Sequence, residues 1–168
     1  ANYDSMLVLS HFKGHPMAGF GGALKNISIG IASSEGKTRI HTGGVFSNPP
    51  ITLGSLLTNQ NVFTESMAEA AKSVSDYEEN GQNIVYISVM NNMSIDCDCV
   101  SKPTEVDMHD IGILASTDPV ALDQACIDLV FRAKDGQLLQ NRILEKNGLH
   151  ILTHAEKIGL GNRAYELI

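Results

Sequence analysis

The fold class is clearest in residues 110–119, which read Asp-Ile-Gly-Ile-Leu-Ala-Ser-Thr-Asp-Pro. The apolar run from Asp110 to Ser116 predicts a buried strand. Asp118 and Pro119 then predict the start of a helix, because Asp is favoured at the N-cap position and Pro at the first helical position. A strand that leads into a helix is the repeating unit of an α/β domain.

Strands and helices alternate in the same way on both sides of this stretch. Residues 83–91 predict another buried strand, and Thr64 caps a predicted helix whose inner face carries Met67 and Ala71. The expected strands are 5–10, 83–91, 110–116 and 164–168, and the expected helices are 17–32, 64–80, 118–133, 137–146 and 152–158, with loops at 11–16 and 33–61. We therefore expect a single α/β domain over residues 1–168, with a mostly parallel sheet flanked by helices in three layers.

The composition argues against several classes of function. The chain has 168 residues, of which 43% are hydrophobic and 18% are charged, and its formal net charge is −7. This acidic balance argues against nucleic acid or an anionic membrane surface as the main partner. No apolar run approaches the roughly 20 residues of a membrane-spanning helix. Three cysteines and no recognisable secretory signal indicate a soluble protein of the reducing cytoplasm.

The first residues, Ala-Asn-Tyr-Asp, contain no methionine, and a strand is predicted almost at once, at Ser5. We therefore expect the sequence to be a piece of a longer protein. Its functional site would then be completed by a preceding portion of the polypeptide or by a second subunit.

Three loops that follow predicted strands carry the chemically informative residues. They are residues 11–16, 91–99 and 116–119. In open α/β sheets, ligands bind beyond the carboxyl ends of the strands. If the three strands are parallel, these loops lie at one edge of the sheet, and we expect them to form one site.

Cys97 and Cys99 lie in the run Asp-Cys-Asp-Cys and predict a metal centre. Residues two apart on an extended chain project to the same side, so both thiols can face one point. Thiolates select zinc, iron or an iron–sulfur cluster over magnesium or calcium. Two ligands do not complete a tetrahedral site, so a metal also needs His11, His15, His41, His109 or another chain. Of these, we expect His11 or His15 to complete the shell. The alternative is a pair of reduced thiols in a loop whose aspartates form turns.

The segment Gly19-Phe-Gly-Gly-Ala-Leu-Lys25 suggests a different ligand. Exposed amides at a helix start hold phosphate or carboxylate well, so Gly21, Gly22 and Lys25, together with Lys13, are candidate anion-binding residues. The segment matches neither the P-loop nor the dinucleotide-binding pattern. Close packing of a glycine-rich helix on the sheet is the alternative explanation.

Four stretches together resemble a known family. They are residues 11–26 (His-Phe-Lys-Gly-His-Pro-Met-Ala-Gly-Phe-Gly-Gly-Ala-Leu-Lys-Asn), 96–99, 110–125 and 154–163. This pattern resembles the iron–sulfur-centre proteins that carry the domain of unknown function 362. The residues that match are His11, Lys13, His15, Lys25, Cys97, Cys99, Asp118 and Asp123.

The resemblance implies a longer parent protein with an additional N-terminal half. It also implies, for many members, a ferredoxin-like insert with two four-cysteine runs that bind [4Fe–4S] clusters. The corresponding place here, residues 37–63, has no cysteine.

Two functions therefore remain open from the sequence. The first is a metal- or iron–sulfur-dependent redox or electron-transfer protein that holds an iron–sulfur cluster or a single zinc or iron ion and meets a redox partner. The second is a module that binds a small anionic ligand without catalysis. The sequence does not fix whether the chain is an enzyme. On the helix that begins at Asp118, we expect Asp118 to be the cap and Asp123 to be solvated or paired with a cation.

Overall fold

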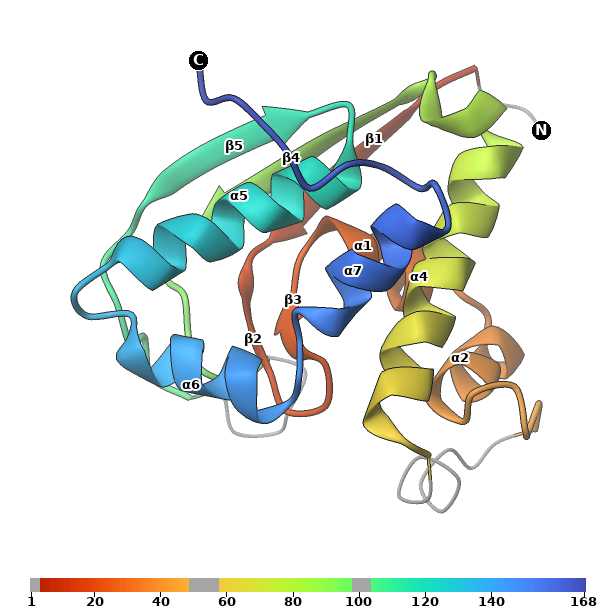
Figure 1. The fold of residues 1–168 in the computed structure, drawn as a ribbon, viewed down its shortest axis with the longest axis horizontal. Helices are drawn as coiled ribbons and strands as arrows, with labels where there is room; N and C mark the ends of the chain where they lie inside the picture. Colours follow the sequence, from red (N-terminus) through yellow and green to blue (C-terminus); the bar gives the residue numbers. More distant parts are fainter. Residues whose placement is uncertain (1–3, 49–57, 98–103) are drawn as a thin grey trace.

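The computed structural model describes residues 4–48, 58–97 and 104–168 (Figure 1). Within them, a three-stranded sheet has the order β1-β4-β5, and β2 pairs with β3 in a separate small hairpin. The strands are β1 (Met6–His11), β2 (Lys13–His15), β3 (Gly19–Gly21), β4 (Ile84–Met90) and β5 (Gly112–Ser116). The helices are α1 (Ala23–Lys25), which continues as the π-helical turn η1 (Asn26–Gly30), α2 (Ser34–His41), α4 (Gln60–Tyr77), the 3-10 turn η2 (Glu79–Gly81), α5 (Pro119–Arg132), α6 (Gln137–Glu145) and α7 (His150–Lys157).

The sheet is mixed, whereas the sequence led us to expect a mostly parallel one. β1 and β4 are parallel, with Met6 opposite Ile84, but β5 runs antiparallel to β4, with Tyr86 opposite Ser116. The reason lies in the connections. The described part of the β1–β4 connection contains α1, α2 and α4, which carry the chain back to the starting edge, whereas the described part of the β4–β5 connection contains no helix. The chain therefore re-enters the sheet from the edge at which it left.

Helices cover one face of this sheet. Figure 1 shows α5 running alongside β4 and β5, on which it packs, while α1 packs on β1 and β4. Side chains that point to this face, such as Val8 and Tyr86, are buried, whereas Leu7 and Leu9 on the opposite face are 65% and 62% exposed. The domain is therefore α/β as predicted, but the third layer that we expected is not among the described elements.

The sequence located most helices but missed some boundaries. The predicted helices at 118–133, 137–146 and 152–158 correspond to α5, α6 and α7. The predicted loop at 33–61 contains α2, whose start is capped by the Ser33 hydroxyl accepting from the Gly36 amide. α4 begins earlier than predicted, because Asn59 provides the cap and Thr64 lies buried inside the helix.

Two other predicted elements differ from the structure. The expected helix at 17–32 is helical only from Ala23 to Gly30, because the chain before it forms the β2–β3 hairpin, in which Gly19 begins β3 with a φ of +84°. The expected strand at 164–168 is not a strand. The Tyr165 hydroxyl donates to Asp128 on α5, which holds this segment beside the helix instead.

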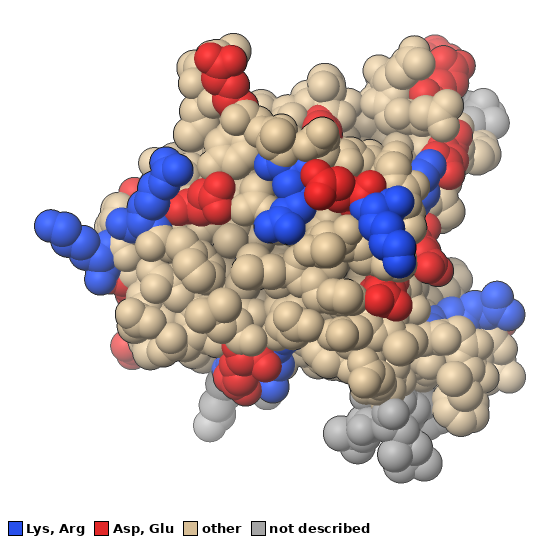
Figure 2. Space-filling model, in the orientation of Figure 1, with Lys and Arg blue, Asp and Glu red and all other residues tan. Residues whose placement is uncertain are grey.

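The surface is not dominated by one sign of charge on the side shown in Figure 2, where lysines and arginines lie among carboxylates. In the described residues, no helix combines the length and apolar character needed to cross a membrane.

Candidate functional site

A cleft of about 180 Å³ lies at the carboxyl end of β1. It is lined by Ser10, His11, Lys13, Gly21, Gly22, Lys25, Asn26, Gly30 and Cys97. Six of the eight residues that the sequence nominated are in this set. Of the other two, His15 lies on β2 but does not line the cleft, and Cys99 lies outside the described residues. The structure therefore brings two of the four candidate metal ligands, His11 and Cys97, to the same cleft as the four candidate anion-binding residues.

The end of β1 is fixed by polar contacts to the elements beside it. Nε2 of His11 lies 2.7 Å from the carbonyl oxygen of Asn91, at the end of β4. Because a carbonyl oxygen only accepts, Nε2 of this ring carries the proton and Nδ1 of the neutral ring keeps its lone pair. The Asn26 amide donates to the Leu9 carbonyl and to the Ser10 hydroxyl, each at 3.0 Å, and so ties the helical segment to β1.

The loop that carries Cys97 packs directly on β2. The Gly14 amide donates to the Ser94 carbonyl at 2.8 Å, and a Cβ at Gly14 would clash with the carbonyl oxygen of Ile95. Only glycine permits this approach. It places Cys97, which is 4% exposed, in the wall of the same cleft as Lys13.

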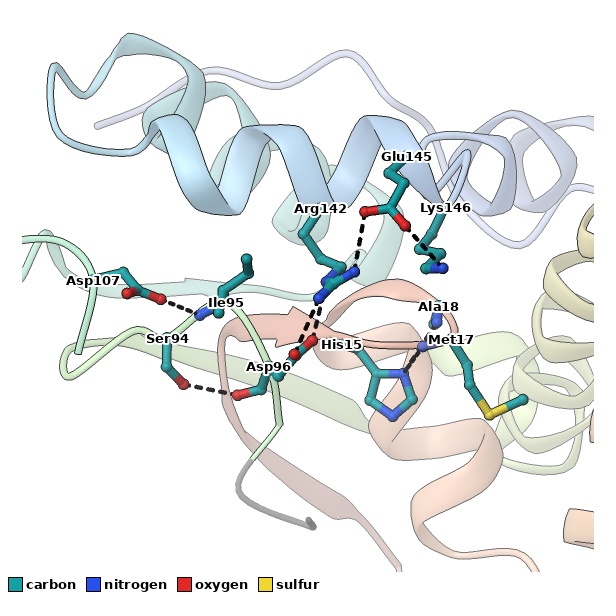
Figure 3. Close-up of polar contacts among 10 residues, drawn as sticks. All are labelled: His15, Met17, Ala18, Ser94, Ile95, Asp96, Asp107, Arg142, Glu145 and Lys146. Carbon is teal, nitrogen blue, oxygen red and sulfur yellow. Dashed lines mark hydrogen bonds and ion pairs between the residues drawn. The ribbon is translucent and has the colours of Figure 1, made fainter. Parts of the chain in front are cut away.

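Figure 3 shows how the same loop is anchored on its other side. Nη2 of Arg142, on α6, donates to Oδ2 of Asp96 at 3.1 Å. Nε of Arg142 also lies 3.0 Å from Oδ1 of Asp96, close enough for an ion pair but outside hydrogen-bonding geometry. The Ile95 amide donates to Asp107 at 2.6 Å. The backbone before Cys97 is thus held by both β2 and α6.

His15 does not fit the role of metal ligand that the sequence suggested. Its Nδ1 accepts from the amides of Met17 and Ala18, at 3.2 and 3.0 Å (Figure 3). Burial lowers the pKa of His15 to about 3, and the positive charges of Lys25 and Lys13 contribute to the shift. His15 is therefore neutral and stabilises the turn of the β2–β3 hairpin.

The amides at the start of the helical segment are occupied by the protein itself. Oδ1 of Asp123 accepts from the Ala23 amide at 2.7 Å and Oδ2 accepts from the Leu24 amide at 3.0 Å. Asp123 was expected to be solvated or paired with a cation, but it is fully buried, and burial raises its pKa to about 7 despite the two amides. A ligand in the cleft therefore meets the lysines and the glycine walls rather than these amides.

Asp118 lies away from the cleft. It caps α5 as predicted, accepting from the amides of Val120 and Ala121, and it also accepts from the Asn162 amide. The third loop was expected to join the other two at one sheet edge. Because β5 is antiparallel, its end at Ser116 lies level with Tyr86, and its start at Gly112 lies level with Met90. Residues 116–119 consequently leave the sheet in the opposite direction.

The cleft is electropositive although the whole chain is acidic. Lys13 comes from β2 and Lys25 from α1, and none of its described lining residues is Asp or Glu. Both lysines act on the buried His15 ring, where they lower its pKa. This arrangement favours a small anion.

The described residues alone do not assemble a metal site. Across residues 4–48, 58–97 and 104–168, no three His, Cys, Asp or Glu side chains are grouped so that they could hold an ion. Of the predicted pair of thiols, only Cys97 lies within the described residues.

Ser10, Asn26 and Gly30 also line the cleft, although they were not among the predicted site residues. Ser10 carried a usable signal, because a polar residue ended an apolar strand next to His11. Asn26 and Gly30 carried none, since their position depends on how the helical segment packs across β1.

Comparison with known proteins gives one match. A family model described as "Domain of unknown function (DUF362)" matches residues 1–128. No curated protein and no solved structure matches the chain.

Proposed function

Because this chain belongs to the DUF362 family, whose description assigns no reaction, we propose a function from the cleft itself: it binds a small oxyanion, such as phosphate or a carboxylate. The observation that carries the proposal is the convergence of Lys13 and Lys25 on a cleft that no described carboxylate lines. The glycine walls allow a ligand to approach the backbone closely.

The size of the cleft supports a small ligand. Its volume of about 180 Å³ is below the roughly 300–1,000 Å³ of pockets that hold drug-sized molecules. Lysine is a compact point charge that suits phosphate, and the Ser10 hydroxyl lines the same cleft.

The test is stabilisation by inorganic phosphate and, in a second arm, by succinate. We expect an anion that binds the cleft to raise the melting temperature above that in chloride of equal ionic strength. A ligand at 100 times its Kd adds about 2.7 kcal/mol to the free energy of unfolding. Lys25→Ala should remove the effect, whereas Lys134→Ala should keep it, because Lys134 is exposed and does not line the cleft. No anion effect on the wild-type protein, or an equal effect on Lys25→Ala, contradicts the proposal.

A second candidate function is metal- or iron–sulfur-dependent electron transfer, with Cys97, Cys99 and His11 as ligands. It is favoured by Cys97 and His11 lining the same cleft, and by the lone pair that Nδ1 of His11 retains. His15 does not belong to this ligand set, and the nearby lysines oppose a bound cation. A further ligand would come from another segment of a longer parent protein or from a second subunit. A bound iron centre would supply one-electron chemistry. This function would require a redox partner, and it would place the protein in the reducing cytoplasm.

Elemental analysis of anaerobically purified protein tests this second function. The double variant Cys97→Ser with Cys99→Ser should lose iron or zinc that the wild-type protein holds. Cys126→Ala is the matched control, because Cys126 is buried on α5 and does not line the cleft. Unchanged metal content in the double variant, or no metal in the wild type, would exclude thiolate ligation.

A further inference from the structure

One face of the β1–β4–β5 sheet is apolar and exposed. Leu7, Leu9 and Ile113 are 65, 62 and 70% exposed, and Val85 is 45% exposed. The strand register places these side chains in adjacent rows, because Leu7 is opposite Val85. We call the whole set the outer face: Leu7, Leu9, His11, Val85, Ile87, Val89, Ile113 and Ala115. It contains no Lys, Arg, Asp or Glu.

An exposed face of this kind is unusual in a monomeric protein. Contiguous apolar patches generally mark interaction sites. β1 and β4 are parallel, and parallel strands are normally covered by helices on both faces. On the inner face of the same strands this cover exists, and Val8 is only 6% exposed and Tyr86 0%.

The dimensions of the outer face match one helix. Its outermost strands lie about 10 Å apart, which is close to the diameter of an α-helix. The six residues of β1 extend for roughly 20 Å, the length of a helix of about 13 residues. A hollow lined by Leu9, Ser10, His11, Val89, Asn91 and Asn92 lies at the carboxyl end and provides room for a helix terminus.

We infer that the outer face binds an amphipathic helix of a partner polypeptide, with aliphatic side chains toward the sheet and basic residues near its ends. The basic residues follow from two exposed carboxylates at opposite ends of the face, Asp4 before β1 and Asp110 before β5. Opposite charges at the rim of an interface steer and orient the partner.

A second copy of the chain fits this surface less well. The net charge of −7 opposes self-association.

Two synthetic 14-residue peptides of identical Leu, Ala and Lys content test the inference. One is amphipathic as a helix and the other is scrambled, so both carry the same charge. We expect the wild-type protein to bind the amphipathic peptide saturably by fluorescence anisotropy and to leave the scrambled peptide unbound. Leu9→Asp with Ile113→Asp should weaken binding at least tenfold. Leu144→Asp should not, because Leu144 is 56% exposed but lies on α6.

Three results would overturn the inference. They are equal binding of the two peptides, unchanged binding by the double variant, and a stable wild-type dimer in sedimentation that the double variant dissociates. The last result would assign the outer face to a second copy of the chain. Far-UV circular dichroism checks that the double variant is folded, and we expect it to be, since both substituted side chains are already exposed.

Discussion

Asp123 combines complete burial with proximity to the cleft. Its carboxylate accepts hydrogen bonds from the first amides of the helical segment. Gly22 lies against this carboxylate, and the position requires glycine because a Cβ there would clash with it. Among the described residues, the hydrogen-bond partners of Asp123 are the amides of Ala23 and Leu24, and no cation contributes to its pKa shift. Tyr86 on β4 and Cys126 on α5 are the nearby titratable groups, and the pKa of each is raised to about 12, mainly by burial and also by the negative charge of Asp123.

This burial predicts a pH dependence of stability. The pKa of Asp123 is raised from 3.8 to about 7 in the folded protein, so between these values the folded state keeps a proton that the unfolded chain has lost. The contribution of Asp123 to the free energy of unfolding therefore falls as pH rises from about 4 to about 7. We expect the difference in unfolding free energy between wild type and Asp123→Asn, measured with urea, to decrease over this range.

The control for this measurement is Asp76→Asn, on the exposed side of α4. The difference between wild type and this variant should not fall over the same range. A wild-type-minus-Asp123→Asn difference that stays constant or rises with pH would show that Asp123 is already ionised at low pH.

Gly22 offers a steric test of the same contact. Gly22→Ala places a methyl group against the Asp123 carboxylate, and overpacking of this kind costs roughly 1–3 kcal/mol. Gly21→Ala is the matched control, because its nearest neighbour would be the flexible Cδ of Lys25 at 3.4 Å. Urea denaturation should show a clear loss of stability only for Gly22→Ala. Equal stabilities of the two variants would mean that the carboxylate moves aside freely.

At the level of the elements, the contact between Arg142 on α6 and Asp96 fixes the loop that places Cys97 in the wall of the cleft. Arg142 is largely buried, with 18% of its side chain exposed, and Asp96 is 21% exposed. Arg142→Gln should lower stability by roughly 1–3 kcal/mol, because it leaves the Asp96 carboxylate without its charged partner. Hydrogen exchange of the amides of residues 94–97 should become faster, while exchange in β4 stays slow.

Arg132→Gln is the control for that experiment. Arg132 lies in the last turn of α5 and is exposed. The Arg132→Gln variant should leave hydrogen exchange at residues 94–97 unchanged. If Arg142→Gln also leaves it unchanged, the contact of Gly14 with Ile95 is sufficient to hold the loop.

For the molecule as a whole, the central feature is a sheet with helices on one face. Neighbouring residues on β1 then tolerate polar substitution very differently. Val8→Asn buries an amide in the core and should unfold or strongly destabilise the protein. Leu9→Asn, on the outer face, should change the unfolding free energy by no more than about 0.5 kcal/mol. Thermal unfolding of the two variants tests whether the outer face is uncovered. Similar losses of stability in both variants would mean that a further layer covers the outer face in the isolated chain.

Much of the fold, and most of the residues that line the candidate cleft, could be predicted from local patterns. The apolar runs predicted β1, β4 and β5, and the Asp-Pro pair predicted the start of α5, because each depends on neighbouring residues alone. The site residues followed from unusual residue types next to strand ends. His15 could not be assigned correctly, since its role depends on two amides in a turn that the sequence does not specify.

The amino-acid sequence by itself determined most of the longer helices, the strands of the main sheet and the residue types that surround the cleft, because propensities, caps and hydrophobic periodicity act over a few residues. The tertiary structure alone decided the antiparallel direction of β5, the occupation of the helix start by Asp123 and the exposure of the outer face. Each of these depends on contacts between residues far apart in the chain, such as Ala23 with Asp123. Such contacts are set by how the whole chain packs its apolar surface.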